Sequence, residues 1–538
     1  MNMSFLSGKY IKNDISAGVV VFLVALPLCL GISLASGAPF FSGLISGIVG
    51  GIIIGALSSS NLSVSGPAAG LAALVYAAIA NVGSFELFLT AVVLAGIIQM
   101  LLGAAQLGGI AEYFPSSVIK GMLTSIGILI IAKQIPHAVG YDRDEKGNIT
   151  QLFPFGNEDW HELLRPLQHI EVGVLFVCLL SIVIMLLWEK PFIKKRVKFV
   201  PGALIAVIVS VVVNEMLKST GSTFTIMPEH LVQIKSASNI SEFFTFFTVP
   251  DFSGFLNSKV IVTGIMIAII ASLETLLSIE AVDNLDPERH VTNTNKELFA
   301  QGIGNVISGL IGGLPITSVI VRSSANINAG GKTNLSAIFH GVLLLICVVS
   351  IPFLLNMIPL ASLAAILLIT GYKLCKVSVF RQMINNGKYQ WVPFFATVIV
   401  ILGIDLFGVY PPFKGEGLLI GVVAGLVVAS IGILLGNLKN SYYFHKEEYH
   451  EHDVIRMHLS EEVSFLNKAS IRETLDHIPE NATIVIDAKS TRYIDFDVVE
   501  IIKEFRDIKA PLKNITCMLE GFKEQYQINN TLNVQSSH

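Results

Sequence analysis

The chain has 538 residues, of which 52% are hydrophobic and only 14% are charged, and its mean hydropathy is +0.67. Soluble globular proteins carry about 25% charged residues, so this composition excludes an ordinary soluble protein and predicts one that meets lipid over most of its surface. A formal net charge of −4 leaves no basic excess for binding nucleic acid.

Apolar segments of about 20 residues, long enough to cross a bilayer as helices, recur along the first 436 residues. Two shorter segments, 65–80 and 322–331, are too short or too polar to cross alone. Together they predict an α-helical membrane protein with about 14 transmembrane segments. The longer segments are 15–35, 40–57, 86–107, 117–136, 171–189, 199–217, 258–282, 297–313, 333–356, 359–375, 391–408 and 415–436.

Basic residues set the predicted orientation, because cytoplasmic loops carry an excess of lysine and arginine. Lys9 and Lys12, the stretch 189–199 and the stretch 373–388 fall on one side when crossings are counted. The long loops between these crossings fall on the other side. We therefore expect a multi-pass protein of the cell inner (plasma) membrane whose N- and C-termini are both cytoplasmic.

The two short segments share one pattern. In "SSSNLSVSGPAAGLAAL" (58–74) an extended stretch leads to a predicted helix start at "SGP" (65–67), followed by small residues. In "TSVIVRSSANINAGG" (317–331) a β-branched stretch leads to a predicted helix start at "RSS" (322–324). One copy in each half of the chain indicates a transporter of two repeats with a site at the bilayer midplane.

A half-helix that begins inside the membrane leaves backbone N–H groups without partners, and its dipole places about half a positive charge at that end. Irregular backbone at this depth requires cover from protein or a water-filled cavity. Two such ends facing each other, with Arg322 beside them, therefore predict a binding site for a small anion.

A carboxylate, Glu274, interrupts the apolar segment "IMIAIIASLETLLSIEAVD" (265–283). A charge near the bilayer centre costs about 2.5–3.5 kcal/mol on insertion scales, so Glu274 is expected to face the protein interior or water. Ser278 lies one turn further along the same face. We interpret this pair as a coupling site for a cation, either Na⁺ or H⁺. A structural hydrogen bond between helices is the alternative.

From about residue 440 the sequence becomes that of a small soluble α/β domain. Residues 453–459 and 484–487 predict strands, and residues 469–478 predict an amphipathic helix. A second helix is predicted where apolar residues recur from Val498 to Phe505. The polar tail, residues 529–538, is predicted to be disordered.

No sequence feature indicates an enzyme. The five cysteines lack the spacing of metal ligands and are interpreted as small core residues. His340 and the stretch "GIGNVISG" (302–309) are interpreted as helix-packing elements, although the second imitates a dinucleotide fingerprint. We expect no catalytic residue, and no cofactor beyond a sodium ion at Glu274 and Ser278.

These motifs resemble the sulfate permease (SulP) family of anion transporters over nearly the whole chain. "SGPAAG" (65–70) resembles the entry to the family's third helix, and "ASLETLLS" (271–278) resembles its eighth. The stretch 301–341 resembles helices nine to eleven. The C-terminal region resembles the family's cytoplasmic STAS domain.

The resemblance implies a fold of seven plus seven inverted repeats, shared with the uracil permease, in a transmembrane domain at residues 1–438. Core helices 1–4 and 8–11 would move against gate helices 5–7 and 12–14, and residues 439–528 would form the STAS domain. The resemblance also implies a homodimer. The implied anion-binding residues are Ser65, Gly66, Ala68, Ile320, Val321, Arg322 and Ser323, and the implied sodium ligands are Glu274 and Ser278.

Two places depart from the family pattern. Ala68 stands where a hydroxyl is common after the third-helix Ser-Gly-Pro, so one expected polar ligand is missing. Phe496 and Asp497 replace the serine that is phosphorylated in soluble STAS relatives, which argues against a phosphorylation switch there.

The expected function is secondary active transport of a small inorganic anion, bicarbonate or sulfate, coupled to Na⁺ or H⁺. Two helix ends contribute about +1, Arg322 about +1 and ionised Glu274 about −1, so the site suits a monovalent anion. A dianion would need Glu274 to be protonated or bound to sodium. Two alternatives stay open: a nucleobase or dicarboxylate cation symporter of the same fold, and a non-transporting membrane sensor that signals through the STAS domain.

Overall fold

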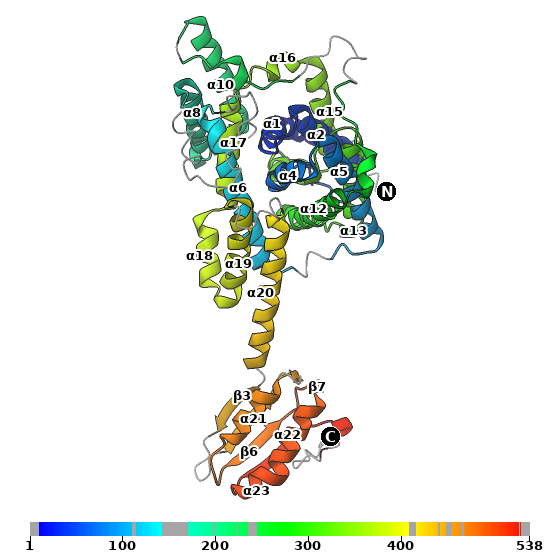
Figure 1. Ribbon diagram of the computed structural model, residues 1–538, viewed down its shortest axis with the longest axis vertical. Helices are drawn as coiled ribbons and strands as arrows, with labels where there is room; N and C mark the ends of the chain where they lie inside the picture. The colour runs from blue at the N-terminus through cyan, green and yellow to red at the C-terminus, as the bar shows by residue number, and fades with distance from the viewer. Residues whose placement is uncertain are drawn as a thin grey trace. The chain divides into compact units, whose positions relative to one another are not determined.

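The structure of the protein is a computed structural model (Figure 1). It describes residues 10–109, 114–141, 170–196, 200–222, 224–234, 245–407, 416–439, 442–447, 454–463, 467–526 and 528. The chain forms two compact units, Met1–Leu426 and Val427–His538.

The first unit is built of helices, because helices satisfy every backbone hydrogen bond within one segment in lipid. The first half of the chain holds α1 (Ile11–Ala35), α2 (Phe40–Val49) with its continuations η2 (Gly50–Ile54) and α3 (Gly55–Leu57), α4 (Ala69–Val82), α5 (Phe85–Ala104), α6 (Ser116–Val139), α8 (Val172–Trp188), α9 (Pro191–Arg196), α10 (Gly202–Ser219), η5 (Pro228–His230) and η6 (Phe252–Leu256). The second half holds α12 (Ser258–Leu285), α13 (Thr294–Leu310), α14 (Ile320–Asn328), α15 (Leu335–Ser350), α16 (Pro352–Leu355), α17 (Leu360–Leu374), α18 (Val377–Asn385) and α19 (Lys388–Asp405). The boundary between the two units falls within α20 (Gly417–Lys439).

Eight of the described helical segments are long and apolar enough to cross a membrane, and α4, α8 and α15 are shorter apolar helices. Each segment predicted from the sequence contains a helix in the described part of the chain. The structure therefore confirms a multi-pass helical membrane protein. The count of 14 crossings stays a prediction.

The helices of the first unit pack in two groups (Figure 1). In one group α12 and α13 lie against α5, and α15 lies against α1. In the other, α17 and α19 lie against α6, and α10 lies against α8. Small residues allow close approach: a Cβ on Gly96 of α5 would lie 2.6 Å from the backbone nitrogen of Val306 in α13. This agrees with the helix-packing interpretation of residues 302–309.

Two short strands connect the halves of the chain. β1 (Ser65–Pro67) pairs antiparallel with β2 (Ile316–Ser318), and Gly66 lies opposite Thr317. β1 leads into α4 and β2 leads into α14, so the strand pair ties together the starts of the two half-helices. The π-helical turn η2 also approaches this pair, since a Cβ on Gly50 would lie 2.5 Å from the carbonyl oxygen of Ser65.

The second unit contains a four-stranded sheet in the order β3-β4-β6-β8, in which the first pair is antiparallel and the others are parallel. Its apolar core includes Ile484, Ile486, Val498 and Ile502. The predicted strands and helices are confirmed, and the arrangement is consistent with a STAS domain. The predicted disordered tail lies outside the described residues. The elements are β3 (Tyr442–Glu447), β4 (Val454–Leu459), β5 (Glu462–Val463), α21 (Lys468–Asp476), β6 (Thr483–Asp487), β7 (Tyr493–Ile494), α22 (Phe496–Glu504), η9 (Phe505–Lys509), α23 (Ala510–Leu512), β8 (Thr516–Glu520) and η10 (Glu524–Tyr526).

Candidate anion site

Both half-helices begin beside the strand pair, but at different residues from those predicted. α4 begins at Ala69 and α14 begins at Ile320, whereas the sequence predicted starts at 65–67 and 322–324. Residues 65–67 form β1 instead, because their backbone pairs with β2. Ile320 and Val321 therefore belong to the first turn of α14 and not to an extended stretch.

Neither half-helix has a side-chain cap. The N-cap residues are Ala68 and Val319, whose side chains cannot accept a hydrogen bond, so the predicted polar caps are wrong at both starts. The first N–H groups of a helix have no acceptor within that helix. Two uncapped starts at one strand pair therefore offer amide donors and positive dipole ends to an anion.

Arg322 is completely buried on the first turn of α14. Its Nη2 donates to the carbonyl oxygen of Pro67 at 3.4 Å and to Sγ of Cys29 in α1, also at 3.4 Å. Nε and Nη1 have no hydrogen-bond partner among the residues that the structure describes. The side chain thus braces the end of β1 and also places a positive charge with spare donors next to both half-helix starts.

Glu274 lies on α12 against the first turn of α4. A Cβ on Gly70 would lie 2.5 Å from Oε1 of Glu274, so the glycine leaves room for the carboxylate. Within the described ranges, no group donates a hydrogen bond to this carboxylate. Ser278, one turn further along α12, is 8% exposed. A carboxylate placed in this way fits the role of holding a proton or a sodium ion.

Ser65 and Ser323 hold the backbone around the strand pair. Ser65 Oγ accepts a hydrogen bond from Nε2 of Gln301 at 2.7 Å. Ser323 Oγ donates to the carbonyl oxygen of Val319 at 2.9 Å and accepts from the N–H of Val64 at 3.0 Å. Both serines are buried, so in this arrangement they shape the junction rather than cap a helix.

The other predicted anion-site residues complete the junction. Gly66 and Ala68 are buried, whereas Ile320 and Val321 are 41% and 49% exposed on the first turn of α14. A Cβ on Gly66 would collide with Nη1 of Arg322, which explains the glycine. The structure thus brings the predicted residues of both halves of the chain to one place.

Sequence reasoning missed several polar residues near the site. Gln301 and Asn305 of α13 bond to β1 and β2, respectively. Lys133 of α6 lies over the ring of Tyr76 in α4, with Nζ 3.8 Å from the ring centroid. The signal was available, because a lysine and two amides stood inside predicted membrane spans, where polar residues are functional by default.

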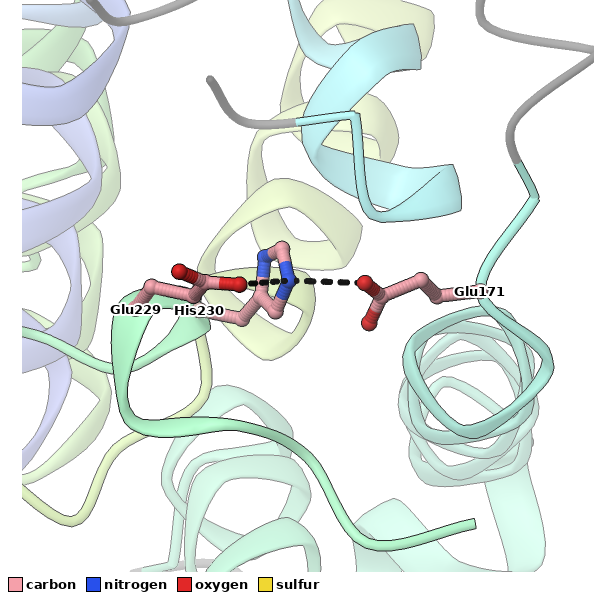
Figure 2. A group of neighbouring side chains, drawn as sticks. All are labelled: Glu171, Glu229 and His230. Carbon is pink, nitrogen blue, oxygen red and sulfur yellow. Dashed lines mark hydrogen bonds and ion pairs between the residues drawn. The ribbon is translucent and has the colours of Figure 1, made fainter. Parts of the chain in front are cut away.

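Three side chains near the start of α8 offer one ligand atom each to a metal ion. Figure 2 shows His230 of η5 between Glu171, the residue before α8, and Glu229. His230 Nε2 lies 3.1 Å from Oε1 of Glu171 and 3.7 Å from Oε1 of Glu229. The three ligand atoms lie within 4.8 Å of one another, and His230 is buried. The contact between His230 and Glu171 fastens η5 to the start of α8.

A helix bundle in which two short helices start side by side at a buried strand pair is typical of membrane carriers. A family model described as "Sulfate permease family" matches residues 11–397. The chain therefore belongs to the sulfate permease family.

Curated relatives match across most of the chain. YvdB of Bacillus subtilis is 27% identical over 534 residues, which cover 96% of this chain and 92% of YvdB. The bicarbonate transporter BicA of Picosynechococcus is 25% identical over 406 residues, which cover 74% of this chain and 68% of BicA. The chloroplastic sulfate transporter 4.1 of Arabidopsis thaliana is 22% identical over 553 residues, covering 98% and 75% of the two chains.

Two solved structures share the fold. The transmembrane domain of a cyanobacterial bicarbonate transporter BicA matches with a TM-score of 0.62 and 22% identity, covering 78% of this chain and 98% of that one. SLC26A9 matches with a TM-score of 0.71 and 16% identity, covering 96% and 85%. The predicted class, a helical membrane protein with a C-terminal α/β region, is thereby confirmed, whereas the count of 14 segments stays a prediction. The relatives are sulfate and bicarbonate transporters and not enzymes.

Proposed function

We propose that this protein is a secondary active transporter of a small inorganic anion, bicarbonate or sulfate, coupled to Na⁺ or H⁺. The observation that carries the proposal is the pair of uncapped half-helix starts at one strand pair, with Arg322 buried beside them. Membership of the sulfate permease family supports it, as do relatives named as carriers of these two anions.

The charges favour an anion. Two helix starts contribute about half a positive charge each, and Arg322 contributes one more. Arg322 has two spare donor nitrogens and makes no ion pair with a carboxylate in the described ranges. A buried charge is costly without a partner, so a bound anion would lower the cost of burying this guanidinium.

Glu274 and Ser278 are the proposed coupling residues. Hard cations take oxygen ligands, and these side chains supply a carboxylate and a hydroxyl on one face of α12. A proton or Na⁺ at Glu274 would make the net charge of the site more positive by one, and this favours the anion. Because coupling between two ligands is reciprocal, the bound anion would favour the cation equally.

Transport is proposed to proceed by alternating access. The core comprises α1, α2, α4, α5 and α12–α15, and the gate comprises α6, α8, α10, α17, α19 and α20. Ala73 of α4 packs on Leu129 of α6 and Ile401 of α19, so the half-helix that starts at the site also contacts the gate. Sliding along this contact would expose the site first on one side of the membrane and then on the other.

The proposed setting is the plasma membrane, with both termini in the cytoplasm and two copies forming a homodimer. The basic stretches 189–199 and 373–388 support this orientation. The C-terminal domain is proposed to serve dimer contacts or regulation.

Uptake of labelled bicarbonate, sulfate and uracil into proteoliposomes, with and without Na⁺ and pH gradients, tests the proposal. We expect saturable, gradient-driven uptake of an inorganic anion without competition from uracil. Glu274→Gln is expected to lose the gradient dependence, whereas Glu280→Gln, on the same helix, is expected to keep it. Unchanged gradient dependence in Glu274→Gln would remove this residue from the mechanism. Absence of any anion uptake would reject transport and favour the sensor.

A further inference from the structure

One face of α13 carries four polar side chains next to the strand pair. Glu297, Gln301, Asn305 and Ser308 are all completely buried and follow one another at spacings of four, four and three residues. These spacings place them in one line along the helix. Buried polar groups require partners, and the partners here belong mostly to β1, β2 and the segments that adjoin them.

Asn305 pairs with β2 in the way that a neighbouring strand would. Its Oδ1 accepts from the N–H of Ile316 at 2.6 Å, and its Nδ2 donates to the carbonyl oxygen of Ile316 at 3.0 Å. Nδ2 also donates to Oε1 of Gln99 in α5 at 2.7 Å. Gln99 in turn donates to Oγ of Ser272 in α12 at 3.3 Å. Asn305 therefore fixes β2 relative to three helices.

Gln301 has the same role for β1. Its Nε2 donates to Oγ of Ser65 at 2.7 Å and to Oε1 of Glu297 at 3.0 Å. Glu297 also accepts from Oγ of Ser58 at 2.6 Å and from the N–H of Ser59 at 3.0 Å. Nε2 of Gln301 is the donor in both bonds, so one amide group links β1 to Glu297 and, through Glu297, to the segment before β1.

We propose that Gln301 and Asn305 are positioning residues that set the anion affinity of the site, an inference that rests on the proposed function. Each amide holds one strand, and each half-helix starts two residues after its strand ends. The two strands already pair with each other, so the amides fix where the pair, and with it both half-helix starts, lies relative to α13, α5 and α12. The geometry of the proposed anion site therefore depends on two amides one turn apart on α13. They act through the strands and not by contact with the anion.

Anion uptake by Asn305→Leu in proteoliposomes tests the proposal. Leucine has a shape close to that of asparagine, and it removes the hydrogen bonds of the side-chain amide without adding charge. The chain offers a matched control in Asn356, whose Oδ1 accepts from the N–H of Ile234 at 2.7 Å and whose Nδ2 donates to its carbonyl oxygen at 2.9 Å. This pairing is the same, but it lies outside the strand pair.

We expect KM to rise about tenfold in Asn305→Leu and to stay within about twofold of the wild-type value in Asn356→Leu, at equal amounts of folded protein. A lower turnover with unchanged KM in Asn305→Leu overturns the proposal, because a merely structural role would give that result. Equal changes of KM in the two variants overturn it as well.

Gln301→Met and Ser65→Ala provide a second test if Asn305→Leu does not fold. Both substitutions remove the hydrogen bond between Gln301 and Ser65, one by removing its donor and the other by removing its acceptor. We therefore expect each to raise KM, and we expect the double variant to raise KM no further than Gln301→Met alone. Effects of the two substitutions on KM that multiply in the double variant contradict the proposal.

Wild-type protein that takes up no anion would reject the proposed function instead. Hydrogen exchange at residues 316–319, expected to be faster in Asn305→Leu than in Asn356→Leu, would then decide the positioning role.

Discussion

The carboxylate of Glu274 lies against the α-carbon of Gly70, so that a Cβ on residue 70 would meet Oε1 of Glu274 at 2.5 Å. Gly70 is the second residue of α4, and Glu274 lies in the middle of α12. The acid proposed to hold the cation therefore lies within contact distance of a helix start proposed to hold the anion. Coupling between the two ions needs no long-range pathway.

Gly70→Ala is expected to abolish gradient-dependent uptake, because the new Cβ forces the Glu274 carboxylate away from α4. The fold is expected to survive, since the displaced atoms end a flexible side chain. Anion uptake with and without a cation gradient measures the effect. Gly109→Ala is the control, because a Cβ there meets no atom of the described residues within 4 Å. Wild-type gradient dependence in Gly70→Ala would contradict the contact.

Arg322→Lys is expected to keep saturable uptake with a raised KM, whereas Arg322→Met is expected to lose it. Lysine retains the positive charge but not the fork of donors that reaches the carbonyl oxygen of Pro67 and Sγ of Cys29. The KM and turnover of both variants separate attraction of the anion from bracing of the strand. Equal loss of uptake in the two variants would mean that bracing is the dominant role.

Hydropathy and small-residue patterns were sufficient to predict the helices and the two interrupted segments, because lipid leaves the backbone few alternatives. The exact helix starts were not predictable in the same way. Ser65 looked like a cap, but its backbone pairs with Ser318, and its hydroxyl bonds to Gln301. These partners lie more than 200 positions away in the chain, so no local rule identifies them.

Arg322 and Glu274 were predictable as site candidates because each is an ionisable residue in a membrane segment. An amide inside a predicted membrane span marked Asn305 as a candidate, but its stretch also reads as helix packing, and that interpretation agrees with the structure at Gly302 and Gly96. One helix face thus packs while another holds the strands. Only the three-dimensional arrangement separates the two uses.

Lys133 and Tyr76 form a cation–π contact between α6 and α4 that is expected to contribute about 0.5–2 kcal/mol to stability. Tyr76→Leu and Lys133→Met should each lower the free energy of unfolding in detergent, and the double variant should lose less than the sum. Tyr76→Phe is the control, because it keeps the ring, and the tyrosine hydroxyl has no hydrogen-bond partner among the described residues. Additive losses would show that the contact contributes nothing.

Glu520, on β8 of the C-terminal unit, gives that unit a predictable dependence on pH. A hydrogen bond from Lys489, with a second from Nη1 of Arg456 at 2.9 Å, holds the pKa of Glu520 below its usual value of 4.5. A depressed pKa in the folded state means that ionised Glu520 stabilises the fold. This contribution is fully present above the unfolded pKa and is lost as the pH falls through the folded pKa.

Glu520→Gln is therefore expected to make the C-terminal unit less stable at neutral pH and to flatten its loss of stability below about pH 4.5. Hydrogen exchange of β4, β6 and β8 in the full-length protein, corrected for the intrinsic rate at each pH, measures this. Asp507→Asn is the control, because the Asp507 side chain is 55% exposed and ion pairs of exposed side chains contribute little. An acid dependence in Glu520→Gln as steep as in the wild type would show that other carboxylates control it.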